Sequence, residues 1–120
     1  MRKSVLVVED DNQIRDLVQH ILQYAGYEVM AAQDGAEAME QLERGQPSLI
    51  VLDLMLPQMS GLQFAERLRQ RGLRPGIPVL VMTAASQAWH KASWIDAEGC
   101  IEKPFKIPAL LDTVSRLAPA

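Results

Sequence analysis

The stretch VLVVEDD occupies residues 5–11 and decides how the rest of the chain is read. Its first four residues are aliphatic, and the carboxylates of Glu9, Asp10 and Asp11 follow at once. A continuous apolar run without polar alternation is typical of a strand that is covered on both faces. Carboxylates belong in water or beside a cation. The stretch therefore predicts a buried strand that delivers acidic groups to one edge of a sheet.

Four further apolar runs resemble this first one. The five runs are SVLVV (4–8), YEVMA (27–31), SLIVL (48–52), PVLVM (78–82) and the brief CI (100–101). Segments with helical spacing lie between the runs and after the last one, so that strand and helix alternate five times. This alternation predicts an α/β fold with a parallel sheet, helices on both faces and right-handed crossovers.

The first and last helical segments carry the clearest apolar stripes. The first stripe runs from Ile14 to Leu22, and either Asp11 or Asn12 can serve as its N-cap. Gly26 lies just past its end, where a helix commonly stops. The other segments with helical spacing are 35–44, 62–71, 86–97 (the least clear of them) and a last stripe over 107–117 with Pro108 in its first turn.

Length, charge and cysteine content exclude several classes of protein. A chain of 120 residues that is 48% hydrophobic suits one domain, which we expect over residues 1–120. The net charge of −3 provides no general field for holding nucleic acid. The single cysteine, Cys100, suits a reducing compartment. No apolar run approaches 18 residues and no signal peptide is recognisable, so we expect a cytoplasmic protein without a membrane partner.

Polar side chains end four of the five predicted strands. Glu9 and Asp10 follow the first strand, Asp53 the third, Thr83 the fourth, and Lys103 comes shortly after the fifth. In open parallel sheets, ligands bind beyond the carboxyl ends of the strands. We therefore expect a carboxylate cluster, a hydroxyl and an ammonium group on one rim of the sheet.

These residue types suit phosphoryl chemistry around a magnesium ion. Two carboxylates about 5 Å apart repel by about 3 kcal/mol at an effective dielectric constant near 20, so the cluster needs a cation. Oxygen ligands without a cysteine and histidine set favour Mg²⁺ over zinc. Lys103 can balance the cluster and hold a phosphoryl oxygen, and the Thr83 hydroxyl can donate to another. The cluster is thus interpreted as a metal cradle for loading one aspartate with phosphate.

Four motifs together resemble the receiver domains of two-component response regulators. They are VLVVEDD, LIVLDLMLPQMSG around Asp53, VMTA around Thr83 and EKPF around Lys103, and the likeness runs from residue 3 to about residue 118. The resemblance implies a flavodoxin-like (βα)5 sandwich of three layers, with a five-stranded parallel sheet in the order 2-1-3-4-5.

The resemblance also implies a role for each site residue. Asp53 would accept a phosphoryl group from a sensor histidine kinase or a phosphotransfer protein. The Asp10 and Asp53 carboxylates and the backbone carbonyl of Met55 would bind Mg²⁺, with Glu9 assisting through water. Asp11 falls outside this set, and we assign it to the cap of the first helix.

Two further residues complete the implied switch. Thr83 and Lys103 would contact the phosphoryl group, and the peptide bond between Lys103 and Pro104 would be cis. Phosphorylation would then change the face formed by the fourth helix, fifth strand and fifth helix, which is also a candidate surface for a homodimer.

The chain departs from the family pattern before Lys103. Cys100 stands where receivers usually carry an aromatic residue whose rotation reports movement of Thr83, and the segment between Thr83 and Lys103 is about two residues short. Trp89 and Trp94 lie in this segment, and we expect at least one of them to fill core volume. These departures leave open a phosphorylation-independent or weakly switching module for dimerisation or partner binding.

An enzymatic interpretation is weaker. Phosphatases of the haloacid dehalogenase type also use an aspartate and Mg²⁺, but they carry a second acid two residues later, where this chain has Met55. No Walker-type loop or Ser-His-Asp set offers another reaction. We expect at most slow self-dephosphorylation, tuned by Met55 and Ala85.

Overall fold

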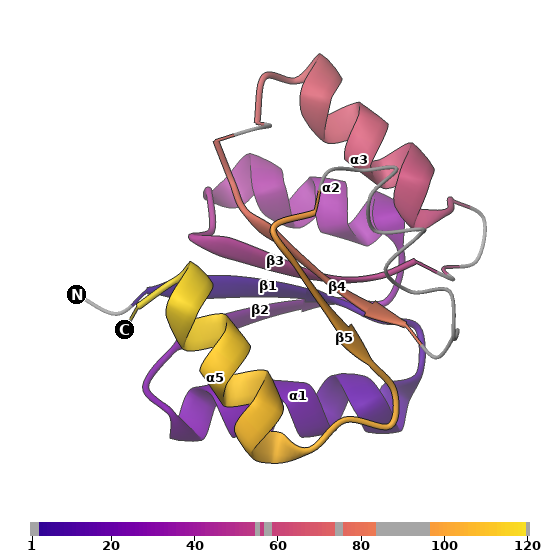
Figure 1. Ribbon diagram of the computed structural model, residues 1–120. Coiled ribbons are helices and arrows are strands. Elements are labelled where there is room, and N and C mark those ends of the chain that lie inside the picture. Colours follow the sequence, from indigo (N-terminus) through magenta and orange to yellow (C-terminus); the bar gives the residue numbers. More distant parts are fainter. Residues whose placement is uncertain (1–2, 55, 57–58, 74–75, 84–96, 120) are drawn as a thin grey trace.

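Five parallel strands form one sheet in the order β2-β1-β3-β4-β5 (Figure 1). This computed structural model describes residues 3–54, 56, 59–73, 76–83 and 97–119. The strands are β1 (Ser4–Val8), β2 (Glu28–Ala32), β3 (Leu49–Asp53), β4 (Val79–Thr83) and β5 (Gly99–Glu102). The α/β class, the parallel sheet and the strand order predicted above are confirmed.

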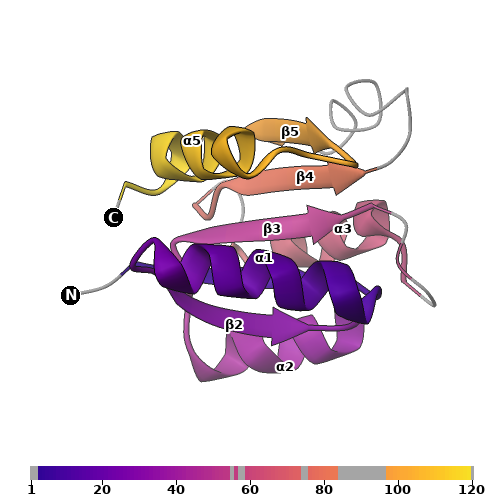
Figure 2. The same ribbon diagram turned by 90° about the horizontal axis from the view of Figure 1, so that it is seen from below.

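The described helices cover the sheet on both faces. They are α1 (Asn12–Tyr24), α2 (Gly35–Arg44), α3 (Gly61–Gln70) and α5 (Ile107–Leu117). Helices α1 and α5 lie on one face of the sheet, and α2 and α3 lie on the other, so the flavodoxin-like three-layer arrangement is confirmed (Figures 1 and 2). The helix expected over 86–97 lies almost entirely outside the described residues.

Continuous apolar strands account for two cores. Leu6 and Ile50 point toward the α2 and α3 side of the sheet, where they pack with Phe64. Their neighbours Val7 and Leu49 point toward the α1 and α5 side. Because successive side chains of a strand face opposite ways, a strand covered on both faces must be apolar throughout.

The register of the sheet brings distant acidic residues together. Val8 pairs with Leu52, so the next residues along the two strands, Glu9 and Asp53, meet at the carboxyl edge. Asp53 pairs in turn with Met82 and is the last residue of β3, whereas the sequence pattern ended that strand at residue 52. The extra pairing fixes the Asp53 backbone to the central strands of the sheet.

Helix α1 begins and ends at the residues that the sequence indicates. Asp11 is its N-cap, and Oδ1 of Asp11 accepts hydrogen bonds from the backbone amides of Gln13 at 2.9 Å and Ile14 at 3.0 Å. Gly26 follows the helix with a positive φ of 101°, a conformation that glycine adopts without strain. The assignment of Asp11 to the cap is confirmed.

Within the described ranges, no helix has the length and apolar character needed to cross a membrane.

Tyr27 links the beginning of β2 to the end of α5. Its ring is buried, and its hydroxyl donates a hydrogen bond of 2.7 Å to the backbone carbonyl of Ala118. Burial raises the pKa of Tyr27 above its usual value near 10. The neutral phenol is therefore the form that the folded chain favours.

We expect Tyr27→Phe to lower the free energy of unfolding by about 1 kcal/mol at neutral pH, because one buried hydrogen bond is lost. The stabilisation from a raised pKa is present below the pKa of the unfolded chain and disappears as the pH rises through that of the folded chain. Wild-type protein should therefore lose stability above about pH 10 more steeply than the variant. Urea unfolding across this range measures both effects.

Tyr24→Phe is the matched control, because the Tyr24 side chain is 97% exposed. It should leave both the free energy of unfolding and its alkaline slope close to those of the wild type. Equal unfolding curves for Tyr27→Phe and Tyr24→Phe would show that the link to Ala118 does not stabilise the fold.

Candidate functional site

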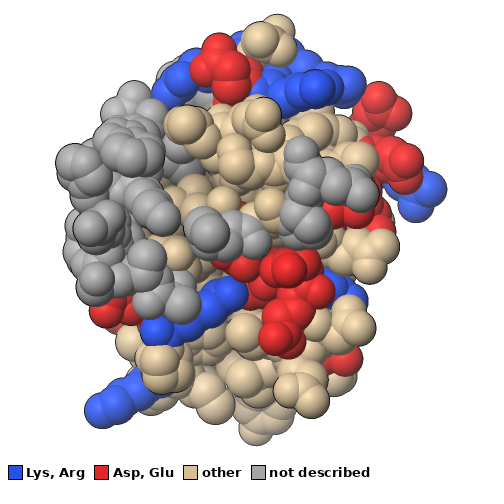
Figure 3. Space-filling view, turned by 90° about the vertical axis from the view of Figure 1, so that its right-hand side faces the viewer, with Lys and Arg blue, Asp and Glu red and all other residues tan. Residues whose placement is uncertain are grey.

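Acidic side chains gather at the carboxyl edge of the sheet. Figure 3 views this end of the molecule and shows a patch of Asp and Glu with Lys or Arg beside it. Side-chain oxygens of Glu9, Asp10 and Asp53 all lie within 4.8 Å of one another. The sequence-based prediction that groups from β1 and β3 meet on one rim is confirmed in its geometry.

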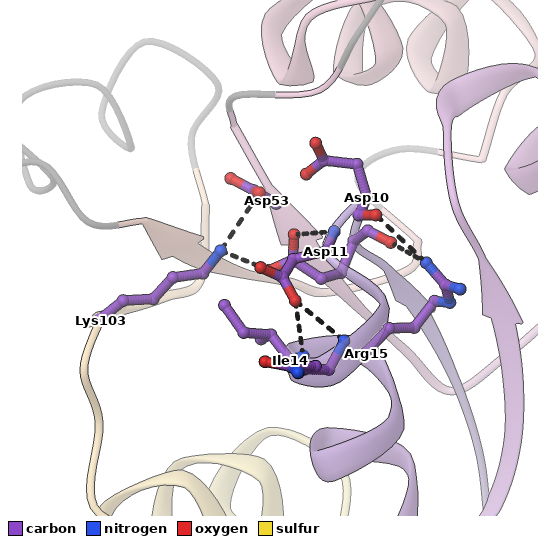
Figure 4. A network of polar contacts seen from close by, with 8 residues as sticks. Asp10, Asp11, Ile14, Arg15, Asp53 and Lys103 are labelled. Atoms are coloured by element: carbon purple, nitrogen blue, oxygen red, sulfur yellow. Dashed lines mark hydrogen bonds and ion pairs between the residues drawn. The ribbon is translucent and has the colours of Figure 1, made fainter.

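Lys103 reaches this cluster from the loop after β5. Its Nζ lies 3.2 Å from Oδ2 of Asp53 and also contacts Oε1 of Glu9 (Figure 4). The Glu9 carboxylate is fully buried, and Asp53 is 4% exposed, whereas Asp10 is exposed. One ammonium group therefore contacts two buried carboxylates, and the third carboxylate faces the solvent.

The pKa of Glu9 reflects this crowding. Burial raises it most, and neighbouring Asp53 raises it further, to about 7. The contacts with Lys103 and with the Asp11 amide, which donates to Oε2 of Glu9 at 3.2 Å, oppose the rise without cancelling it. Burial lowers the pKa of Lys103, but the contacts with Glu9 and Asp53 outweigh it and the net shift is upward. Burial is thus the main cause of the raised pKa of Glu9, and the charge of Lys103 offsets it only in part.

Thr83 lies at the same edge of the sheet. It is the last residue of β4 and is fully buried. Its backbone carbonyl accepts a hydrogen bond of 2.9 Å from the Lys103 amide, which joins the end of β4 to the loop after β5. The peptide bond between Lys103 and Pro104 is cis, as the resemblance implies.

Several predicted features of the site cannot be placed. Met55, Ala85, Trp89 and Trp94 lie outside the described residues. Cys100 is described: it is buried in the core on the α2 and α3 side, and burial, followed by the charge of Glu102, raises the pKa of its thiol. Cys100 thus packs as a small apolar residue of the core, which is the usual environment of a free cysteine.

The sequence analysis missed Arg15. This residue lies in the first turn of α1, and its Nη1 donates a hydrogen bond of 2.8 Å to the backbone carbonyl of Glu9. The available signal was a cation at a helix N-terminus, where the helix dipole disfavours positive charge unless another group compensates. Three preceding carboxylates, Glu9, Asp10 and Asp11, offered that compensation.

The sequence analysis also missed an apolar hollow beside the cluster. A pocket of about 360 Å³ is lined by Ile14, Leu17, Lys103, Pro104 and Phe105. Leu17 is 49% exposed although it belongs to the apolar stripe of α1. The stripe predicted the helix but could not tell which of its members lie at the margin of the core.

The donor atoms fit a small divalent cation. An ion that binds oxygen at about 2.0–2.1 Å spans ligands up to about 4.2 Å apart, and a coordinated water extends this reach. The oxygens of Glu9, Asp10 and Asp53 all lie within 4.8 Å of one another, so these residues would hold one small divalent ion among them. A carboxylate held beside such an ion and an ammonium group can attack a phosphorus centre, because both cations neutralise charge on the phosphoryl oxygens.

Comparison with protein families gives one match over most of the chain. The profile described as "Response regulator receiver domain" matches residues 5–115. The chain is 39% identical over 107 residues to the alkaline phosphatase synthesis transcriptional regulatory protein PhoP of Bacillus subtilis, covering 88% of this chain and 44% of that protein. It is 35% identical over 115 residues to the response regulator MprA of Mycobacterium leprae, covering 94% of this chain and 50% of the relative. The chain thus spans about half the length of these curated relatives.

Solved structures of response regulators also superpose on this chain, and each covers nearly all of it. The chemotaxis response regulator CheY4 of Vibrio cholerae superposes with a TM-score of 0.90 at 34% identity, covering 98% of this chain and 99% of the other. The receiver domain of NtrX from Brucella abortus superposes with a TM-score of 0.85 at 32% identity, covering 94% and 96%.

We expect Lys103→Met to lower the free energy of unfolding by about 3 kcal/mol in the absence of divalent cations, because it leaves two buried carboxylates without their cation. Asp53→Asn removes one of these negative charges, so the same lysine substitution should cost less in that background. Chemical unfolding with EDTA present measures both values.

Lys106→Met is the matched control for the loss of one positive charge. Lys106 is exposed at the N-cap of α5 and forms no side-chain capping hydrogen bond. Its substitution should change stability by less than about 0.5 kcal/mol. If the two lysine variants lose the same stability, the contacts of Lys103 with the cluster contribute nothing to the fold.

Proposed function

The chain belongs to the response regulator receiver domain family, and on this premise we propose that Asp53 is the phosphoacceptor of a two-component signalling system. The observation that carries the proposal is the meeting of three carboxylates with Lys103 at the carboxyl edge of the sheet. Of the three, Asp53 is the one held in a strand while its side chain contacts the ammonium group.

The proposed reaction transfers a phosphoryl group from a phosphohistidine to Asp53. A carboxylate oxygen of Asp53 attacks phosphorus while the bond between phosphorus and the imidazole nitrogen breaks, and the released imidazole takes up a proton. Magnesium, when held by Asp10, Asp53 and the Met55 carbonyl, with Glu9 acting through water, would neutralise charge on the transferred group. This role agrees with the oxygen-only donor set and its 4.8 Å spread.

Lys103 and Thr83 have roles after the transfer in this proposal. The Lys103 ammonium, which contacts Oδ2 of Asp53, moves to a phosphoryl oxygen as that carboxylate loses its charge. The Thr83 hydroxyl donates to a second phosphoryl oxygen. Their displacement would alter the face made by the helix expected over 86–97, β5 and α5, and this face would change its partners or pair with a second copy.

A sensor histidine kinase or phosphotransfer protein is the proposed donor. The pocket lined by Ile14, Leu17 and Phe105 shares Lys103 with the acidic cluster. A protein seated on this apolar hollow would thus lie next to Asp53. Apolar side chains in a concave surface are what a partner helix can bury.

The coarser features of the proposal follow the family. Receiver domains are generally phosphoacceptors and not catalysts, so we assign no independent enzymatic activity. We further propose that residues 1–120 form one receiver domain that works in the cytoplasm, without contacting nucleic acid or membrane directly.

Asp53→Asn should abolish labelling by acetyl phosphate in the presence of Mg²⁺, because an amide oxygen is a poor nucleophile toward phosphorus. Intact-mass spectrometry measures the labelling. Asp112→Asn is the control, since Asp112 is exposed on α5 and should leave labelling unchanged. Labelling of the Asp53→Asn protein at the wild-type level would reject this residue as the acceptor.

Leu17→Asp should slow phosphotransfer from a phosphorylated histidine kinase by about tenfold, which corresponds to about 1.4 kcal/mol of lost docking energy. Labelling by acetyl phosphate should be unaffected, because a small donor needs no docking surface. Leu62→Asp is a closely matched control: Leu62 is 47% exposed and Leu17 is 49% exposed, but Leu62 lies on α3. Equal transfer rates to both variants would place the kinase elsewhere.

A further inference from the structure

Arg15 holds the backbone of the loop that carries the acidic cluster. Its Nη1 lies 2.8 Å from the carbonyl oxygen of Glu9 and 3.5 Å from that of Asp10. The second guanidinium nitrogen, Nη2, donates to the side chain of Asn12. The guanidinium group therefore spans the junction between β1 and α1. Figure 4 shows that Arg15 approaches the cluster from the side opposite Lys103.

The choice of partners is informative. Arg15 follows three carboxylates and could pair with one of them, yet among the described residues its hydrogen bonds go to two carbonyls and an amide. Planar guanidinium groups suit such divergent contacts, because their donors point in fixed directions. Lys103 contacts carboxylate oxygens, whereas Arg15 contacts the main chain that positions them.

The consequence falls on Asp10. This residue is exposed, and in the described part of the chain its carboxylate accepts no hydrogen bond. Arg15 holds the main chain on either side of the Asp10 Cα, because its Nη1 donates to the carbonyl of the Glu9–Asp10 peptide and to that of the Asp10–Asp11 peptide. A carboxylate that is positioned through its backbone and is exposed to solvent is available to a cation.

We propose that Arg15 is a positioning residue that holds the loop of Glu9 and Asp10 in the geometry that a divalent cation needs. The inference rests on the proposed function, because it concerns the Mg²⁺ site of that function. Arg15 does not touch the cation or the phosphoryl group, and its effect passes through the two carbonyl contacts.

Whether Mg²⁺ binds more tightly or more weakly after Arg15 is replaced distinguishes a positioning role from a purely electrostatic one. A positive charge near the cluster repels Mg²⁺, so its removal alone would tighten metal binding. Loss of the backbone contacts would let Asp10 move and would weaken binding. Lysine provides a second test, because it keeps the charge but lacks the fork that reaches two carbonyls and Asn12.

The experiment measures the Mg²⁺ affinity of the full chain by isothermal titration calorimetry for three proteins: the wild type, Arg15→Met and Arg15→Lys. We expect both variants to bind Mg²⁺ about tenfold more weakly, the usual cost of losing a residue that orients a metal ligand. Arg116→Met is the control, since Arg116 is an exposed arginine on α5 and its loss changes the net charge equally. It should bind Mg²⁺ as the wild type does.

Thermal unfolding in EDTA tests whether the variants keep the fold. Weaker Mg²⁺ binding by Arg15→Lys with an unchanged melting temperature supports positioning, because a merely structural role would lower the melting temperature and not the affinity of the folded protein. Wild-type affinity in either Arg15 variant, or tighter binding by Arg15→Met, overturns the inference and leaves the proposed function intact. Absence of Mg²⁺ binding by the wild type overturns the metal role itself.

Discussion

The mutual repulsion of Glu9, Asp10 and Asp53 is the constraint on which this molecule depends. A sheet that brings three carboxylates within 4.8 Å, with Glu9 fully buried, is unfavourable unless positive charge accompanies it. Lys103 provides part of that charge from a loop 94 residues along the chain from Glu9, where one ammonium group accompanies three carboxylates. Under the proposed function, a divalent cation would supply the remaining positive charge, and the same cluster would then serve phosphoryl transfer.

The apolar strands make this arrangement possible. Strands β1, β3 and β4 are buried on both faces, so their register is determined by packing and hydrogen bonding over their whole length. The backbone positions of the residues at the carboxyl ends of these strands are consequently determined by the packing of the core. Asp53 gains further from its pairing with Met82 in β4. The geometry of the acidic cluster thus rests on apolar side chains that do not belong to it.

Much of this could be predicted from the sequence, for reasons that particular residues show. The run from Val5 to Val8 has one stable environment, and an aspartate before an apolar stripe has one obvious use as a cap, so β1 and Asp11 were predictable from local rules. Asp53 and Lys103 followed from the rule that strand ends share a rim. Arg15 was missed because its closest contact with the loop is to the Glu9 backbone carbonyl, which no sequence pattern reveals. The role of Met55 stays a prediction.

The hydrogen bond between Tyr27 and Ala118 has a consequence for the layout of the whole domain. It fixes the last turn of the chain beside the start of β2, and Figure 1 shows both termini at the end of the sheet opposite the carboxyl ends of the strands. The acidic cluster and the two termini therefore lie at opposite ends of the domain, and a segment fused after α5 would leave from the end away from the cluster. Under the proposed function, a reporter attached there would leave the approach of a phosphodonor to the acidic cluster unobstructed.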